Sequence, residues 1–349
     1  RVASLRDFLI WMYSTTQPLW SIPAECVERV REALGAGWRV LSVEEEQDAT
    51  GDGPVGTPAG VLQEISGAEV FVGFGIGRDA FLAGKRLRWV HSAAAGVGRS
   101  LFPEMVESDV LFTNSAGLYA EPVSEHALAM ILYFARGLDV AAAGMRSRSW
   151  KREALAGPTG PLIDLEGRVL GVVGYGGIGR AIGRRASALG MRVWALRRSP
   201  PAEDDLPPEV ERMWGSEGLD ELLEGSDYVV LTVPETPSTI RLIGARELGL
   251  MGKGAVLINV ARGRIVHEVA LADALRAGRL RGAGLDVFEV EPLPAESPLW
   301  GLDNVLLTPH VGGISSGFWG RQTDLLIRNI RRYLDGRPME NLVDKRLGY

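Results

Sequence analysis

Cysteines and long apolar runs are scarce in this chain of 349 residues. It has one cysteine, Cys26, which excludes a disulfide within the chain, and we expect a reducing compartment such as the cytoplasm. The longest apolar runs, such as residues 127–135, are far shorter than the roughly 20 residues of a membrane-spanning helix. Residues 8–13 are too short and wrongly flanked for a signal peptide, and we expect them to form a strand.

Positive charge is also limited. The chain has 38 Lys and Arg against 44 Asp and Glu, a net charge of -6, and it has no long basic stretch. We therefore expect no general affinity for nucleic acid. A hydrophobic fraction of 46% with 23% charged residues is typical of globular proteins, and the length predicts about two domains. We predict no metal site.

The strongest positive signal lies near the middle of the chain. The apolar run Val169 to Val173 predicts a buried strand, and it leads into Gly174, Gly176 and Gly179 at G-x-G-x-x-G spacing, where a helix should begin. A second strand is predicted at Arg192 to Leu196. In a dinucleotide site such glycines permit the turn and the approach of a pyrophosphate to the helix N-terminus. A glycine-rich turn that binds nothing is the alternative, and the flanking strands favour the dinucleotide site.

A carboxylate is missing after the second of these strands. NAD-binding units usually place Asp or Glu there to bind the ribose 2'-hydroxyl, whereas this chain has Arg197, Arg198 and Ser199. Guanidinium groups can bind a 2'-phosphate through paired, charge-assisted hydrogen bonds. We therefore predict that NADP(H) is preferred and that NAD(H) is possible. Two solvated arginines on a loop are the alternative.

The remaining pattern alternates strands and helices, which predicts an α/β protein with two doubly wound parallel sheets. We expect a Rossmann NAD(P)-binding domain at 117–319, inserted in a flavodoxin-like substrate domain made of 1–116 and 320–349. Besides those named above, the predicted strands are 38–43, 69–73, 87–91, 110–113, 228–233, 255–260, 282–287 and 304–307. The predicted helices include 24–34, one around 61–65, 269–277 and 322–334, the last of which could return to the first domain.

Three further segments have distinctive compositions. Residues 44–60 are polar and rich in Gly and Pro, so we predict a long surface loop. The predicted helix Val123 to Gly137 is apolar all round, which is typical of a helix in a large core or at a subunit interface. Residues 147–167 are interpreted as a connection.

Reactive side chains follow three of the predicted strands. Arg262 follows 255–260, Glu291 follows 282–287 and His310 follows 304–307. Ligands of open α/β sheets bind at the carboxyl ends of the strands, so these residues should share the edge that carries the glycine loop. A cation, a carboxylate and an imidazole beside a nicotinamide suit the reduction of a 2-keto acid.

Each residue also has a structural alternative. Arg262 could cap a strand end, Glu291 could be a solvated loop carboxylate, and His310 could be a core histidine with satisfied hydrogen bonds. The other three histidines lie in predicted strands or helices and rank below His310. The small-residue turn over residues 92–98 could hold a carboxylate on consecutive N–H groups, or it could be a plain turn packed closely against another element.

Five ordered motifs, VVGYGGIGR, VPETPST, NVARGRIV, AGLDVFEVEPLP and LTPHVGG, resemble the D-isomer-specific 2-hydroxyacid dehydrogenase family over roughly residues 87–315. The resemblance implies that Arg262 binds the substrate carboxylate and carbonyl, and that His310 is the general acid/base, hydrogen-bonded to Glu291. It implies that the turn Ala94, Ala95 and Gly96 binds the substrate carboxylate. Together with the glycine pattern it assigns to the cofactor site Gly174, Gly176, Gly177, Ile178, Gly179, Arg197, Arg198, Ser199, Val233, Pro234, Thr239, Val260, Ala261, Arg262, Asp286, His310 and Gly312.

The sequence departs from the family pattern at Arg197, at Gly98 and at His267, where many members have Asp or Glu. We expect the departure at His267 to affect only the surface of the protein. The first 80 residues match the family only in their α/β character. Asp286 could position the cofactor or His310, or it could be structural.

We therefore predict an NADP(H)-preferring D-2-hydroxyacid dehydrogenase that reduces a small 2-keto acid such as glyoxylate or hydroxypyruvate. By resemblance we expect a homodimer through the nucleotide-binding domains, with helix 123–137 near the interface. The alternatives are a dehydrogenase for a substrate such as phosphite, and a nucleotide-sensing binding protein or corepressor on the same fold. Formate enzymes of this superfamily have Gln in place of the Glu partner, so Glu291 argues against formate.

Overall fold

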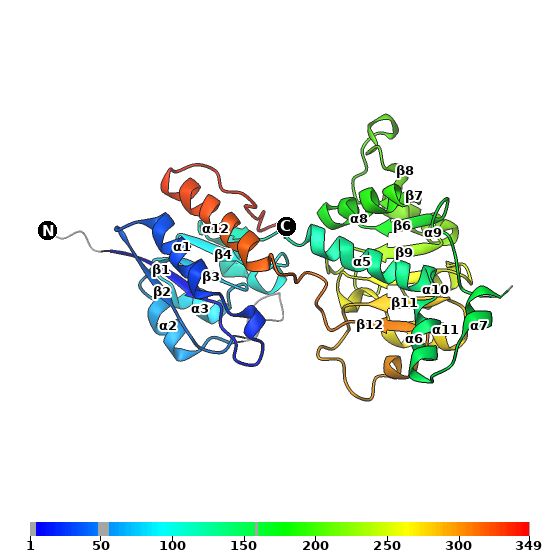
Figure 1. Cartoon of the computed structure of the whole chain (residues 1–349). Coiled ribbons are helices and arrows are strands. Elements are labelled where there is room, and N and C mark those ends of the chain that lie inside the picture. The colour runs from blue at the N-terminus through cyan, green and yellow to red at the C-terminus, as the bar shows by residue number, and fades with distance from the viewer. Residues whose placement is uncertain (1–4, 48–55, 158–159, 349) are drawn as a thin grey trace. The chain divides into compact units, whose positions relative to one another are not determined.

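A computed structural model describes residues 5–47, 56–157 and 160–348 (Figure 1). The chain divides into two compact units. The first unit comprises Arg1–Tyr119 and Ser315–Tyr349, and the second comprises Ala120–Ile314. The sequence placed these boundaries after residues 116 and 319. Much of the predicted surface loop at 44–60 lies outside the described residues.

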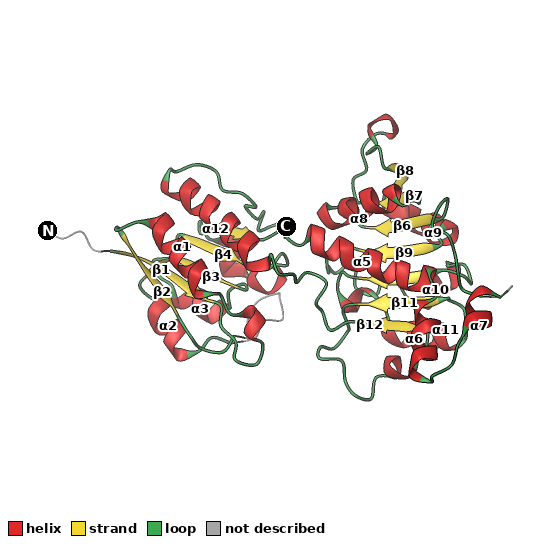
Figure 2. Cartoon of the chain, in the orientation of Figure 1, coloured by secondary structure: helices red, strands yellow, loops and turns green. Residues whose placement is uncertain are grey.

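The first unit contains a five-stranded parallel sheet in the order β2-β1-β3-β4-β5 (Figure 2). This is the flavodoxin-like order, as predicted. Its strands are β1 (Arg6–Trp11), β2 (Trp38–Ser42), β3 (Ala68–Gly73), β4 (Trp89–Ser92) and β5 (Leu111–Asn114). Its helices are α1 (Ala24–Leu34), α2 (Ala59–Ile65), α3 (Arg78–Ala83), α4 (Pro103–Glu107) and α12 (Phe318–Leu334).

Alternate side chains of this sheet enter two separate cores. Phe8 and Ile10 pack in a cluster with residues of α1 and α12, whereas Leu9 and Trp11 pack in a cluster with residues of α2, α3 and α4. Side chains alternate between the two faces of a strand, so a parallel sheet covered on both faces needs a continuous apolar run. This requirement explains why a strand was evident from the sequence, although it was predicted at 8–13 and the structure has it at Arg6–Trp11.

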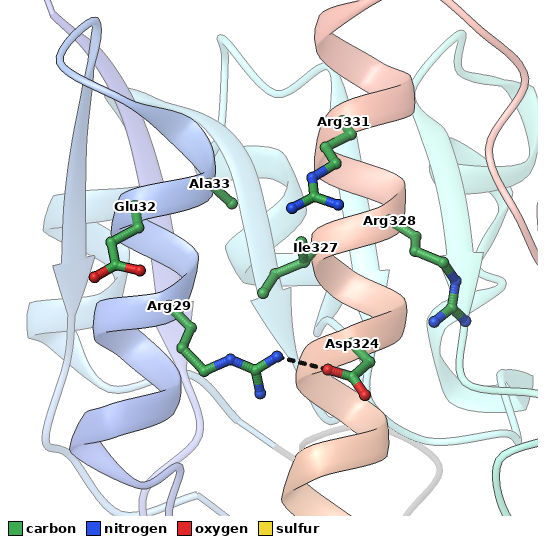
Figure 3. Close-up of a pocket in the computed structure, with 7 residues that line it drawn as sticks. All are labelled: Arg29, Glu32, Ala33, Asp324, Ile327, Arg328 and Arg331. Carbon is green, nitrogen blue, oxygen red and sulfur yellow. Dashed lines mark hydrogen bonds and ion pairs between the residues drawn. The ribbon is translucent and has the colours of Figure 1, made fainter.

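Helix α12 packs beside α1 in the first unit, to which the sequence suggested that it could return, and it begins at Phe318, four residues earlier than predicted. Between the two helices lies a groove of about 430 Å³, in which Arg29 Nη2 lies 2.6 Å from Asp324 Oδ1 (Figure 3). The groove is lined by Arg29, Glu32, Ala33, Asp324, Ile327, Arg328 and Arg331. It lies on a different unit from Arg262, Glu291 and His310. Exposed ion pairs add about 0 to 1 kcal/mol each, so apolar packing of α12 carries most of this contact.

The second unit contains a seven-stranded parallel sheet in the order β12-β11-β10-β9-β6-β7-β8. Read from β8, this is the Rossmann order with one additional strand, which confirms the predicted fold class. Its strands are β6 (Val169–Val173), β7 (Arg192–Leu196), β8 (Val210–Trp214), β9 (Tyr228–Leu231), β10 (Val256–Asn259), β11 (Gly282–Leu285) and β12 (Val305–Leu307). Its helices are α5 (Ala120–Ala135), α6 (Leu138–Arg146), α7 (Arg152–Ala156), α8 (Gly177–Ala188), α9 (Leu219–Gly225), α10 (Ala245–Leu250) and α11 (Glu268–Arg276).

Helix α5 packs closely on the second sheet. A Cβ added to Gly282 would lie 2.5 Å from the Phe134 ring, and one added to Gly284 would lie 2.8 Å from the sulfur of Met130. These glycines therefore allow the helix to approach β11. Among the described residues no single helix is long and apolar enough to cross a membrane. The consecutive helices α5 and α6 have sufficient length and apolar composition only when they are taken together, and they are bent by 72° relative to each other.

Some predicted boundaries in this unit were wrong. Helix α5 ends at Ala135 instead of residue 137, because Gly137 adopts a left-handed conformation (φ 61°) and α6 begins after it. The segment interpreted as a connection contains α7. The edge strand β8 was missed because most of its side chains are only partly buried or exposed, so it has no apolar run.

Candidate active site

The glycine turn follows β6 as the motif predicts. Gly174 has φ 101°, and a Cβ there would lie 2.8 Å from the Val233 backbone nitrogen. A Cβ at Gly179 would lie 2.3 Å from the Gly174 carbonyl oxygen, so the first turn of α8 can approach the loop only without a side chain. A Cβ at Gly176, the N-cap of α8, would meet nothing within 4 Å. The backbone here is open to a ligand at a helix N-terminus, which fits a pyrophosphate.

The segment after β9 supports this turn. The Thr232 hydroxyl donates to the Gly174 carbonyl, and the Thr239 hydroxyl donates to the Pro234 carbonyl over 2.7 Å. Val233, Pro234 and Thr239 were assigned to the cofactor site from the sequence. The structure brings Val233 against the glycine turn and folds Thr239 back onto Pro234.

The end of β7 carries exposed arginines. Arg197, Arg198 and Ser199 are all exposed, and the Arg197 backbone N–H donates to the Trp214 carbonyl of β8 over 3.0 Å. The chain therefore presents cationic groups where NAD-binding units present a carboxylate.

Arg262 lies in a turn that is shaped by its neighbours. The buried Asn259 at the end of β10 accepts from Ala261 N–H and donates to the Arg262 carbonyl over 3.0 Å. A Cβ on Gly263 would lie 1.8 Å from the Phe288 carbonyl carbon, so only glycine lets this turn contact the segment after β11. The Arg262 side chain is half-buried and donates to the Ala261 carbonyl over 2.7 Å.

Glu291 and His310 form a direct pair. His310 Nδ1 lies 2.7 Å from Glu291 Oε2, while Glu291 Oε1 accepts from Phe288 N–H over 2.9 Å. The second bond fixes the carboxylate, and the carboxylate orients the imidazole. The His310 side chain is 38% exposed, so its Nε2 can face a ligand. Such a pair is the arrangement used to hold a histidine for proton transfer.

Asp286 organises the turn that carries His310. Its carboxylate accepts from the backbone N–H groups of Val311 and Gly312 over 2.9 and 2.8 Å, and from the Thr308 hydroxyl over 2.6 Å. Burial alone would raise the pKa of this carboxyl, but the hydrogen bonds from His126, Thr308 and the two N–H groups outweigh burial, and the pKa is lowered. Asp286 is therefore an ionised carboxylate that accepts several hydrogen bonds.

His126 was ranked low from the sequence, yet it belongs to this cluster. Its Nε2 lies 2.9 Å from Thr308 Oγ1 and 3.4 Å from Asp286 Oδ1. The Thr308 hydroxyl donates its proton to Asp286, so it accepts from His126. No local motif places residue 126 of α5 beside the end of β12, because the contact is purely tertiary.

The substrate turn lies in the first unit, directly after β4. Ala94 is buried, and Ala95 and Gly96 are half-buried. Arg262, Glu291 and His310 all belong to the second unit. The other two histidines have structural surroundings: His91 is buried in β4, and His267 is the half-buried N-cap of α11, where its Nδ1 accepts from Ala270 N–H over 3.1 Å. The expectation that the departure at His267 affects only the surface was therefore wrong, because this side chain caps α11.

Residues 128–312 match the sequence model of the D-isomer specific 2-hydroxyacid dehydrogenase family, NAD binding domain. The chain belongs to this family. Its members are oxidoreductases that act on CH–OH groups with a nicotinamide cofactor, and the glycine turn described above fits that cofactor.

The similarity of this dehydrogenase to known proteins extends beyond the domain that the family model matches. The chain is 38% identical over 273 residues to a glyoxylate reductase of Thermococcus gammatolerans, covering 76% of this chain and 79% of the relative. A D-isomer specific 2-hydroxyacid dehydrogenase of Xanthobacter autotrophicus, solved with NADPH and MES, superposes with a TM-score of 0.76 at 29% identity, covering 98% and 99% of the two chains. An NADPH-dependent glyoxylate/hydroxypyruvate reductase of Sinorhizobium meliloti, solved with NADP and sulfate, superposes with a TM-score of 0.77 at 25% identity, covering 99% and 100%.

Proposed function

We propose that this dehydrogenase reduces a small 2-keto acid, such as glyoxylate or hydroxypyruvate, with NADP(H) as the preferred cofactor. The observation that carries the proposal is the 2.7 Å contact between His310 Nδ1 and Glu291 Oε2. It leaves the imidazole Nε2 as the proton donor at the edge of the sheet that also carries the glycine turn. The glyoxylate reductase relative supports the substrate class.

In the proposed mechanism Arg262 binds the substrate carboxylate and carbonyl oxygen, and the N–H groups of Ala95 and Gly96, in the turn Ala94–Gly96, bind the carboxylate. A nicotinamide bound at the glycine turn would supply the hydride that adds to the carbonyl carbon. His310 Nε2 donates a proton to the carbonyl oxygen, which becomes the hydroxyl of the product. Glu291 keeps the imidazole in place throughout. The same groups serve the reverse reaction, in which His310 accepts the proton.

A substrate panel tests the reaction. We expect the protein to consume NADPH with glyoxylate or hydroxypyruvate, and we expect no NADPH formation from NADP⁺ with phosphite. Turnover with phosphite alone would support the non-keto-acid alternative. Tight NADPH binding without turnover of any 2-keto acid would support a nucleotide-sensing protein and contradict the proposal.

The cofactor preference rests on the exposed Arg197 and Arg198 at the end of β7. We expect Arg197→Asp to lower kcat/KM for NADPH by about tenfold or more, because a carboxylate repels the 2'-phosphate and removes a charge-assisted bond. Arg192→Ala is the matched control, since Arg192 is the first residue of β7, at the end of the strand opposite to Arg197, and pairs with Glu211. Similar kcat/KM values for NADH and NADPH in the parent protein would contradict the preference.

We further propose a homodimer through the second unit. After α5, the chain exposes large apolar side chains: Met145 is 82% exposed and Trp150 is 91% exposed. Contact with a second copy would remove this apolar surface from water. Light scattering should give twice the mass of the chain, and Trp150→Ser should shift the protein towards the monomer. A monomeric parent would contradict the dimer. Location in the cytoplasm stays a prediction.

A further inference from the structure

The carbonyl groups at the start of the substrate turn are occupied. The carbonyls of three consecutive residues, Ala93 to Ala95, accept hydrogen bonds from other parts of the first unit. The bonds are Gln322 Nε2 to Ala93 O at 2.7 Å, Ser115 N to Ala94 O at 3.1 Å and Asn114 Nδ2 to Ala95 O at 2.8 Å. The Tyr119 hydroxyl also donates to Ala93 O.

These contacts determine where the N–H groups of the turn point. A trans peptide is planar, and its N–H lies opposite the C=O of the same peptide unit. When the carbonyls of Ala94 and Ala95 face Ser115 and Asn114, the N–H groups of Ala95 and Gly96 must face the other way. Over residues 5–47, 56–157 and 160–348, neither N–H has a hydrogen-bond acceptor. Two successive N–H groups without an acceptor form a site for an anionic oxygen.

Two buried amides hold this arrangement in place. Gln322, on α12, is 4% exposed; its Oε1 accepts from Ser115 Oγ over 2.6 Å and its Nε2 donates to Ala93 O and to the Tyr119 hydroxyl. Asn114 is 5% exposed, and its Oδ1 accepts from Ala116 N–H over 3.2 Å. Burying an amide is unfavourable unless its polar atoms are bonded, and here both amides use those bonds to fix carbonyls of the turn or the segment beside it.

We propose that Gln322 and Asn114 are positioning residues for the substrate carboxylate. They do not touch the substrate. They hold the carbonyl side of the turn, so that the N–H groups of Ala95 and Gly96 are aimed at the carboxylate before it binds. This inference rests on the proposed function of the turn.

The test compares KM with kcat. We expect Gln322→Met, which keeps the length of the side chain and loses all its hydrogen bonds, to raise KM for glyoxylate about tenfold or more, the loss expected when hydrogen bonds to a charged group are misaligned. kcat should change less than KM, and the Kd of NADPH should not change. Ser115→Ala, a milder change that removes only a hydroxyl, should raise KM in the same direction by a smaller factor. An unchanged KM in both variants overturns the proposal.

Asn329 provides a matched control on the same helix. It lies two turns after Gln322 and is fully buried, and among the residues that the structure describes its side chain bonds only to the backbone of Glu340, at 3.0 and 2.7 Å. Asn329→Leu should lower the Tm as Gln322→Met does, without a rise in KM. An equal rise in KM in both variants would show a general loss of structure and overturn the positioning role.

A binding measurement separates this inference from the proposed reaction. Oxalate, titrated by calorimetry into the complex with NADPH, should bind the parent and bind Gln322→Met and Asn114→Ala about tenfold more weakly. If the parent turns over no 2-keto acid but shows this pattern, the proposed reaction fails and the positioning role stands. If the parent reduces glyoxylate but the variants bind oxalate as the parent does, or if the parent binds no oxalate, the positioning role fails.

Discussion

The turn after β4 and the turn after β12 are built in opposite ways. In the first, the carbonyls of Ala93 to Ala95 are held by side chains and by one backbone N–H, and the N–H groups of Ala95 and Gly96 remain for a ligand. In the second, the N–H groups of residues 310–312 are held by the carbonyl and carboxylate of Asp286, and the imidazole of His310 remains.

The difference follows from what each turn is proposed to present. An anion needs donors, so the first turn must neutralise its own acceptors. A proton-transfer group needs a fixed side chain, so the second turn uses a buried carboxylate to immobilise its backbone. Amides suit the first task because they donate without adding charge, and an ionised Asp286 suits the second because it can accept several donors at once.

The strongest test of this contrast removes the side chain that the second turn presents. We expect His310→Ala to lower kcat about 100-fold or more, the usual contribution of a general acid, while NADPH still binds. Steady-state kinetics with glyoxylate and fluorescence titration of NADPH measure both. A kcat within about tenfold of the parent would contradict the role of His310.

The next test replaces Asp286, the carboxylate that accepts hydrogen bonds from the backbone of the second turn. Asp286→Asn leaves one acceptor oxygen for the Val311 and Gly312 N–H groups, so one buried donor faces an NH₂ group. We expect a loss of about 3 kcal/mol in the free energy of unfolding, and a lower kcat as the His310 turn loosens. Urea unfolding and kinetics of the same preparation measure both effects. A variant with the stability and kcat of the parent would show that the turn does not depend on this carboxylate.

A pH titration tests the strand that leads into the first turn. Burial lowers the pKa of His91 to about 3, so the folded protein keeps this histidine neutral while the unfolded chain binds a proton below about pH 6.5. The stabilisation is present above pH 6.5 and is lost as the pH falls, by about 1.4 kcal/mol per pH unit.

We expect His91→Gln to reduce this slope of unfolding free energy between pH 7 and 5, measured as urea unfolding at each pH. An equally steep slope in parent and variant would assign the acid sensitivity to other groups.

The smallest effect belongs to a histidine outside both turns. His267→Ala should lower the free energy of unfolding by about 1 kcal/mol, because α11 loses its N-cap, whereas His267→Asp should retain the cap. Thermal unfolding measures the difference, and kcat should not change in either variant. A large fall in kcat would show that His267 belongs to the active site, and the comparison of the two turns would then be incomplete without it.

Buried elements were the easiest to predict. The bounds predicted for α1, β6 and β7 are those of the structure, because a buried parallel strand needs an apolar run and an amphipathic helix shows its period. The short helices α3, α4 and α7 and the edge strand β8 were missed, since short or half-exposed elements carry too few apolar residues to show a period.

The sequence by itself determined the fold class and the strand ends at which Arg262, Glu291 and His310 stand, because parallel strands bring their carboxyl ends to one edge. Only the tertiary structure decided which groups hold the His310 turn and the substrate turn. His126 meets Thr308 across 182 residues, and Gln322 meets Ala93 across 229. Hydrogen bonds between such distant residues have no period and no fixed spacing, so they become visible only when the chain has folded.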